Sequence, residues 1–187
     1  MLLPLKYYGD PVLRKRGERV EDLSPAVEQL IEDMFETMAE YNGIGLAAQQ
    51  VGEALQLTVL DIRPVEDRPS TLEIGGREEE PDSIMPLVLI NPEVKPLADA
   101  VPGGEGCLSF PEMSAEIDRP ERVSVKAMDG GGEPLEFECG GLLARAIQHE
   151  TDHLNGILFI DRMDRATKAD LQEQLDALRA KTLAALA

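Results

Sequence analysis

The two histidines of this 187-residue chain, His149 and His153, stand four positions apart in the segment QHETDHLNG (148–156). Positions i and i+4 of a helix share one face, so both imidazoles can bind a single metal ion. Glu150 lies beside the first histidine and is long enough to reach a water on that metal. A chance pair of surface histidines is the alternative, but this helix is apolar enough to be buried, where unpaired polar groups are costly. We therefore predict a metal site.

A third ligand is needed, because two histidines leave a metal ion under-coordinated. Cys107 is the candidate, in the segment PGGEGCLSFP (102–111), whose glycines let the backbone approach another group closely. A cysteine taken alone is more often a small buried hydrophobic residue. Beside a two-histidine helix we favour a ligand, because thiolate binds zinc or ferrous iron strongly. Cys139 lies in an alternating run without such a setting, and we expect it in the core.

The segment GIGLAAQQVG (43–52) combines glycines, small apolar residues and two amide side chains. Its glycines are compatible with a helix stop followed by a tight crossover, and equally with backbone that lies flat against a substrate. Gln50 carries an amide donor that cannot ionise, which suits it to hold a carbonyl oxygen as that oxygen becomes negative. Gln50 is therefore a candidate oxyanion-binding residue.

Two helices are predicted around these segments. The first covers residues 25–41, with Ser24 as its N-cap, apolar residues at helical spacing, and Asn42-Gly43 as its stop. The second covers 141–155, carries the two histidines, and ends before Gly156. The histidine helix is expected to lie at the centre of the protein, because its apolar positions flank the histidine face.

A third, amphipathic helix is predicted over residues 165–187 at the end of the chain. Thr167 and Asp170 form a capping-box pattern at its start. The apolar stripe that follows is narrow, and the rest of the face is polar. We therefore expect this helix to rest on the protein by one edge.

Four apolar or alternating runs predict β-strands, at residues 57–62, 86–91, 123–129 and 134–139. Residues 63–83 are rich in Pro, Gly and charge, and predict a solvated loop or hairpin excursion. This excursion either borders the substrate cleft or decorates the surface, and we expect decoration. The predicted elements follow the order helix, strands, helix, helix, with no βαβ alternation. This order predicts an α+β fold, with antiparallel or mixed sheets around a central HExxH helix.

Composition limits the classes of function. A net charge of −18 and a pI of about 4.4 argue against nucleic-acid binding and against attraction to anionic membranes. Two cysteines make no disulfide framework, and no signal peptide or membrane-spanning run is recognisable. We expect a cytoplasmic protein whose residues 1–187 form a single catalytic domain.

GIGLAAQQVG, EGCLSFP and QHETDHLNG, in this order, resemble the three signature motifs of the peptide deformylase family. The resemblance covers about residues 15–160. It implies removal of the N-formyl group from the initiating methionine of newly made polypeptides, with release of formate. Three matched motifs are much more specific than the two-histidine helix alone.

The resemblance implies that Cys107, His149 and His153 are the metal ligands and that Glu150 is the catalytic carboxylate. Three protein ligands leave a fourth position for water, whose pKa falls toward about 7. Attack of the metal-bound hydroxide on the formyl carbon is then expected, with Glu150 as general acid and base. The family implies one divalent ion, ferrous iron in the cell, while ligand softness also allows zinc, nickel or cobalt.

The resemblance also assigns residues to the substrate. Gln50 and the backbone N–H of Leu108 are expected to bind the oxyanion. Ile44, Gly45 and Gly106 are expected to lie along the substrate, whose backbone pairs with the protein as an added strand.

Two other classes of function remain open on the residues. A zinc peptidase of the HExxH type would need a third ligand other than Cys107, such as Asp161 or Glu173. A binding module with a structural metal would hold the ion in a closed site of four protein ligands.

Two further features bear on partners and specificity. The C-terminal helix is less basic than in family members that dock on the ribosome through it, so we expect weak attraction to ribosomal RNA. Its charged residues are Arg165, Lys168, Arg179 and Lys181 against Asp170, Glu173 and Asp176. Arg145, one turn before His149, either reaches the wall of the specificity pocket or faces solvent.

Overall fold

The computed structural model describes residues 1–187 and has three α-helices and nine β-strands. The helices are α1 (Pro25–Glu40), α2 (Leu142–Leu154) and α3 (Arg165–Leu186). The strands are β1 (Gly45–Ala47), β2 (Leu57–Leu60), β3 (Ser70–Ile74), β4 (Arg77–Glu79), β5 (Leu87–Pro96), β6 (Ala100–Cys107), β7 (Phe110–Pro120), β8 (Arg122–Met128) and β9 (Pro134–Gly141). Short 3₁₀ helices cover Pro11–Arg14, Ala48–Val51, Pro81–Ile84 and Phe159–Asp161. The predicted α+β class with antiparallel sheets is confirmed.

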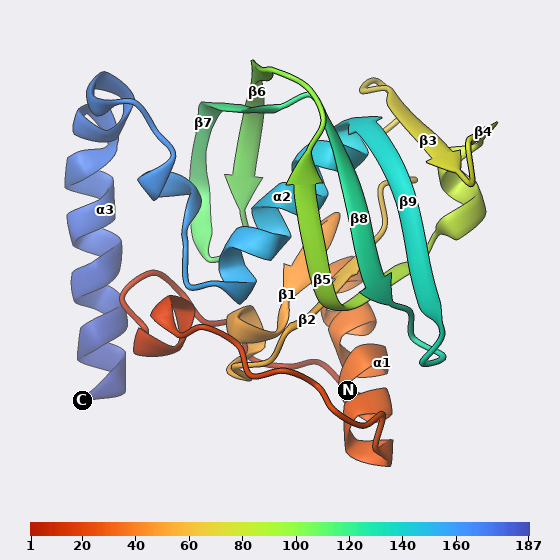
Figure 1. Ribbon diagram of the computed structural model, residues 1–187. Coiled ribbons are helices and arrows are strands. Elements are labelled where there is room, and N and C mark those ends of the chain that lie inside the picture. Colours follow the sequence, from red (N-terminus) through yellow and green to blue (C-terminus); the bar gives the residue numbers. More distant parts are fainter.

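Seven strands form one antiparallel sheet in the order β1-β2-β5-β8-β9-β3-β4, and β6 pairs with β7 in a second, two-stranded sheet. Figure 1 shows α2 lying against the large sheet, α3 at one side of the molecule and the β3–β4 hairpin at the opposite side. Strand β1 is an edge of the large sheet, and β6 has a neighbour on one side only. Two strand edges are therefore free for pairing with another chain.

Residues 63–83 contain β3 and β4, and β3 pairs with β9. This excursion therefore extends the large sheet as a hairpin. The short strand β1 and the β6–β7 hairpin are the parts of the sheet structure that were not predicted from the sequence. Glycine and proline interrupt the alternation of the hairpin at 102–106, and such residues are depleted in most strands.

Helix α2 is held on nearly every side, with ten of its 13 residues buried. Its first residues are fixed by the neighbouring β3: the Leu142 N–H donates to the Pro69 carbonyl at 3.0 Å, and the Leu143 N–H to Ser70 Oγ at 2.9 Å. Gly141 has φ +69°, and a Cβ there would lie 2.2 Å from the Pro69 carbonyl oxygen. Glycine is therefore required where the chain turns from β9 into α2.

Helix α3 begins differently from the prediction. Its N-cap is Asp164, whose side chain accepts from the Thr167 N–H at 2.7 Å, so the predicted capping box of Thr167 and Asp170 is wrong. Asp164 is three residues upstream of Thr167, the spacing that lets a cap reach an N3 donor. Leu175 is the one buried residue of α3. Neither this helix nor any other combines the length and apolar character that a membrane crossing requires.

Candidate active site

The three predicted metal ligands meet at one point, although Cys107 is far from the histidines in sequence. The Sγ of Cys107 lies 3.3 Å from Nε2 of His153, and ligand atoms of Cys107, His149 and His153 lie within 4.8 Å of one another. Cys107 is brought there at the end of β6, and the histidines by successive turns of α2. The group contains neither Asp161 nor Glu173, two candidates for the third ligand of an HExxH peptidase.

The donor set fits a divalent metal ion of borderline softness. With metal–sulfur and metal–nitrogen bonds of about 2.3 and 2.1 Å, tetrahedral donors are about 3.5 Å apart, close to the observed sulfur–nitrogen separation. Both histidines are buried. Burial lowers the pKa of His153 well below its usual value, with His149 adding to the effect. A neutral imidazole is the form that binds a metal.

His149 is fixed in orientation by a buried carboxylate. Its Nδ1 lies 2.8 Å from Oε1 of Glu105, which leaves Nε2 directed at the cluster. Arg119 holds the same carboxylate with two hydrogen bonds, at 2.6 and 2.9 Å. Burial would raise the pKa of Glu105, but His149 and Arg119 override it and lower that pKa to about 2. Glu105 is therefore a permanent anion beneath the first histidine.

Arg119 continues this network to the other end of the helix. It donates to Asp152 at 2.8 Å, and its own side chain is only 4 % exposed. Glu105 and Arg119 were not predicted as site residues. Glu105 lies inside the PGGEGCLSFP motif, and its position two residues before Cys107 was the signal that could have identified it. Nothing in the sequence links Arg119 to Glu105.

Glu150 lines the cleft from α2, next to His149. Its carboxylate packs against Gly45, where a Cβ would lie 2.5 Å from Oε1 of Glu150, so a larger residue at this position in β1 would displace it. The other oxygen, Oε2, is buried and has no hydrogen-bond partner in the protein. Burial raises the pKa of Glu150 to about 7. A carboxylate with one free oxygen and a raised pKa can accept and return a proton.

Gln50 reaches the cluster from the 3₁₀ helix that follows β1. Its Oε1 accepts from the Ala47 N–H at 2.9 Å, which fixes the orientation of the amide. Its Nε2 then lies 3.6 Å from Sγ of Cys107 and 3.2 Å from Oγ of Ser109. An N–H donor is thus held beside Cys107, as an oxyanion site requires.

A cleft of about 560 Å³ opens onto the cluster. It is lined on one side by Gly43, Ile44 and Gly45 at the edge strand β1, and on the other by Gly104, Glu105, Gly106 and Leu108 at the edge of β6. The residues predicted to lie along a substrate therefore occupy both walls. An extended peptide between two such edges can pair with them through its backbone.

Arg145 lines the same cleft but does not face solvent, so that alternative is wrong. Its side chain is buried and donates to Glu105 at 3.0 Å and to the Ile117 carbonyl at 2.7 Å. Gly103 makes room for it, because a Cβ there would lie 2.6 Å from the guanidinium carbon. The sequence did not show this burial because both partners are remote in the chain.

The fold and the site define an α+β protein with a Cys/His₂ group for a divalent metal at the base of a peptide-sized cleft. Residues 2–169 match the model of the polypeptide deformylase family. A peptide deformylase from Opitutus terrae is 45% identical, over 99% of this chain and 97% of its own length. A crystal structure of a peptide deformylase from Legionella pneumophila aligns with a TM-score of 0.80 and 34% identity, over 98% of each chain. Another, from Synechococcus elongatus in complex with actinonin, aligns with a TM-score of 0.77 and 40% identity, over 91% of this chain and 85% of that one.

The chain belongs to the polypeptide deformylase family. It is accordingly a hydrolase that removes the N-formyl group from formyl-methionyl nascent polypeptides. The reaction breaks one amide bond and yields formate and a free amine.

Proposed function

We propose that deformylation takes place at the Cys107, His149 and His153 group, with these three residues as the ligands of one divalent metal ion. The observation that carries the proposal is their convergence within 4.8 Å at the base of the cleft. We take ferrous iron as the ion used in the cell, on the resemblance to the family. The same donors accept zinc, nickel or cobalt.

The chain's own residues then perform the proton transfers and hold the developing charge. The ion supplies Lewis-acid chemistry and lowers the pKa of the attacking water. Glu150 accepts a proton from that water as its oxygen bonds to the formyl carbon, and returns the proton to the leaving nitrogen as the amide bond breaks. Gln50 and the Leu108 N–H donate hydrogen bonds to the tetrahedral oxygen.

The substrate backbone is held between the two free strand edges. Gly45 contacts it from β1 and Ile44 from the residue just before β1, and Gly106 contacts it from β6. Because these elements come from distant parts of the sequence, we also propose that residues 1–187 act as one catalytic domain. Because the substrates are nascent chains, we also propose that the protein acts in the cytoplasm. Attachment to the ribosome through α3 stays a prediction of weak binding.

Replacing Glu150 by Gln tests the mechanism most directly. The variant keeps the shape of the side chain but cannot accept a proton, so formate release should fall at least about a hundredfold. Metal content, measured by elemental analysis, should remain near one ion per chain. Glu116→Gln, on the exposed face of β7, is the matched control and should keep full activity. A Glu150→Gln enzyme that releases formate at the native rate would refute the role of Glu150.

Replacing Cys107 by Ala separates this proposal from its rivals. Loss of one of three ligands should lower both metal content and formate release. Retention of the metal by Cys107→Ala, together with cleavage of unformylated peptides, would instead favour a peptidase. Spectroscopy that finds four protein donors around the ion would favour a structural site.

A further inference from the structure

Arg68 is the one side chain of the 63–83 excursion that reaches the substrate cleft. It lines the cleft together with the β6 edge, and its Nη1 donates to the Gly104 carbonyl at 3.0 Å. We expected this excursion to decorate the surface, and the position of Arg68 in the cleft wall contradicts that expectation. The excursion therefore contributes a cation to the wall of the cleft.

The backbone of Arg68 is firmly placed. Pro69 follows it, and a residue before proline is restricted to extended conformations. The Pro69 carbonyl and the Ser70 hydroxyl accept the first N–H groups of α2, at 3.0 and 2.9 Å. Arg68 thus projects from a segment that is bonded to the helix carrying both histidines.

The guanidinium of Arg68 has no carboxylate partner, although the chain has 36 acidic residues. Its one hydrogen bond is to Gly104, and it takes part in no ion pair of the protein. Arg63, five residues earlier, is paired with Asp61. The exposed Arg68 therefore keeps most of its five N–H donors for a ligand in the cleft.

The register of the β6 edge tells which substrate residue comes near Arg68. The Gly104 carbonyl is presented to the cleft, since it accepts from Arg68, which lines the cleft with it. Residues two apart on a strand present their backbone groups to the same side. Gly106 therefore also faces the cleft. With the formyl oxygen at Leu108, a substrate running antiparallel to β6 places its second residue at Gly106 and its fourth at Gly104.

We propose that Arg68 is a specificity-determining residue that favours an acidic side chain at the fourth position of the substrate. A carboxylate there can accept two N–H groups from the guanidinium fork. The Gly104 carbonyl has two lone pairs, so Arg68 and the substrate backbone can bind it together. The inference rests on the proposed function, because it uses the placement of the formyl group at Leu108.

The test uses peptides formyl-Met-Ala-Ala-Xaa-Ala with an amidated C-terminus, where Xaa is Glu, Gln or Lys. Amidation leaves the side chain at the fourth position as the only carboxylate. The measured quantity is the ratio of kcat/KM for the Glu peptide to that for the Lys peptide, from formate release by the metal-loaded enzyme. This ratio should fall about two- to fivefold in Arg68→Gln, as expected for an exposed ion pair, and Arg68→Lys should retain part of it.

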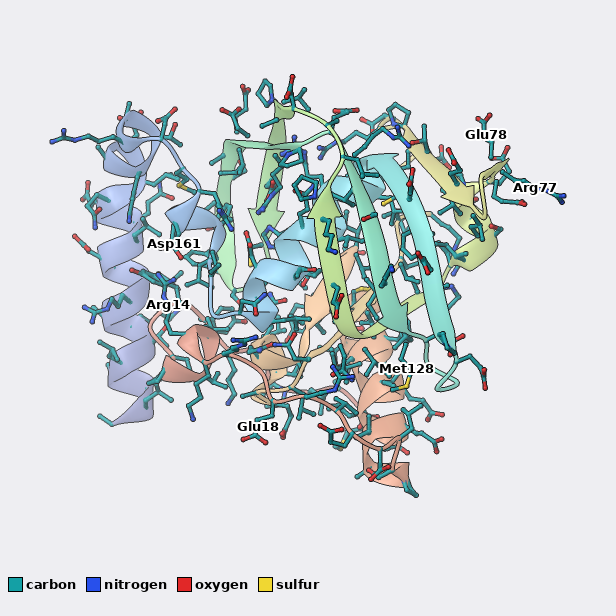
Figure 2. All side chains as sticks on the ribbon, in the orientation of Figure 1. Arg14, Glu18, Arg77, Glu78, Met128 and Asp161 are labelled. Atoms are coloured by element: carbon teal, nitrogen blue, oxygen red, sulfur yellow. The ribbon has the colours of Figure 1, made fainter.

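Arg77→Gln is the matched control. Arg77 belongs to the same excursion, forms no ion pair, and lies at the outer end of the β3–β4 hairpin, as Figure 2 shows. Both variants lose one positive charge, so a long-range effect of the overall charge of −18 would alter both ratios equally. The native ratio should survive in Arg77→Gln and should shrink at high salt in the native enzyme.

Two results would overturn the inference: a ratio that is the same in the native enzyme and Arg68→Gln, or one that falls equally in Arg68→Gln and Arg77→Gln. Both presuppose that formate is released. Failure to release formate from any of these peptides would contradict the proposed function itself, so the two failures are distinguishable.

Discussion

Helices α2 and α3 follow one another in the chain, yet they are held in different ways. Ten of the 13 residues of α2 are buried, against one of the 22 residues of α3. The match to the family model ends at residue 169, near the start of α3. Almost every position of α2 is thus constrained by the core or by the cleft, whereas α3 is held by a single stripe. Substitutions around α2 should cost much more than those around α3.

The largest effect is expected for Glu105→Ala, at the base of α2. Glu105 bonds His149, Arg119 and Arg145, all of them buried. Its removal leaves buried Arg145 without a carboxylate partner and Arg119 with Asp152 alone, at a cost of about 3–5 kcal/mol in the free energy of unfolding. Denaturant unfolding at matched metal content measures this cost.

Glu116→Ala is the control for that prediction. Glu116 lies on the same hairpin opposite Gly104 but is exposed and forms no ion pair, so its loss should change the free energy of unfolding by less than about 0.5 kcal/mol. Equal costs for Glu105→Ala and Glu116→Ala would show that the buried network does not support α2.

Leu175→Ala should produce the next largest effect and measures what α3 contributes. Leu175 is 1 % exposed and packs in the cluster that includes Phe110 and Phe159. Its truncation should cost about 2–4 kcal/mol in thermal or denaturant unfolding. Leu183→Ala on the same helix, where the side chain is 42% exposed, should cost little. Similar costs at Leu175 and Leu183 would mean that α3 is not held by one stripe.

Asp164→Ala should lower the melting temperature, because it removes the N-cap of α3. Asp170→Ala distinguishes this cap from the one that the sequence analysis predicted. If Asp170 were the partner in a capping box, its loss would destabilise the protein as much as the loss of Asp164. Because the Thr167 N–H donates to Asp164, we expect Asp170→Ala to have the smaller effect. Thermal unfolding of the two variants in parallel decides between them.

The error at this cap shows where sequence reasoning worked and where it did not. The two-histidine spacing, the glycine-rich segment around Cys107, the Gln50 segment and the helices were predictable because each is a pattern of residues close together in the chain. Glu105, Arg119 and the burial of Arg145 depend on contacts 14 to 44 residues apart, which local spacing does not encode. The β6–β7 hairpin was not predicted because its glycines, which line the cleft, are depleted in most strands.

The smallest effect is expected for the pair that ties the start of the chain to the segment before α3. Arg14 and Asp161 face one another in Figure 2, with Nη2 of Arg14 3.1 Å from Oδ1 of Asp161. Burial would raise the pKa of Asp161, but hydrogen bonds from Arg14 and the Leu158 N–H override it and lower that pKa below its usual range. Both side chains are partly exposed, so solvent screening limits the pair to about 0.5 kcal/mol.

The lowered pKa of Asp161 determines how the contribution of the Arg14–Asp161 pair to the free energy of unfolding depends on pH. A carboxyl whose folded-state pKa lies below its unfolded value contributes stability above the unfolded pKa, and loses it as the pH falls through the folded pKa. The difference in the free energy of unfolding between the native protein and Arg14→Gln should therefore be constant from about pH 5 to 7 and shrink below about pH 4. Urea unfolding across this range measures it. A difference that grows as the pH falls would contradict the assignment, because protonated Asp161 has no charge left for Arg14 to stabilise.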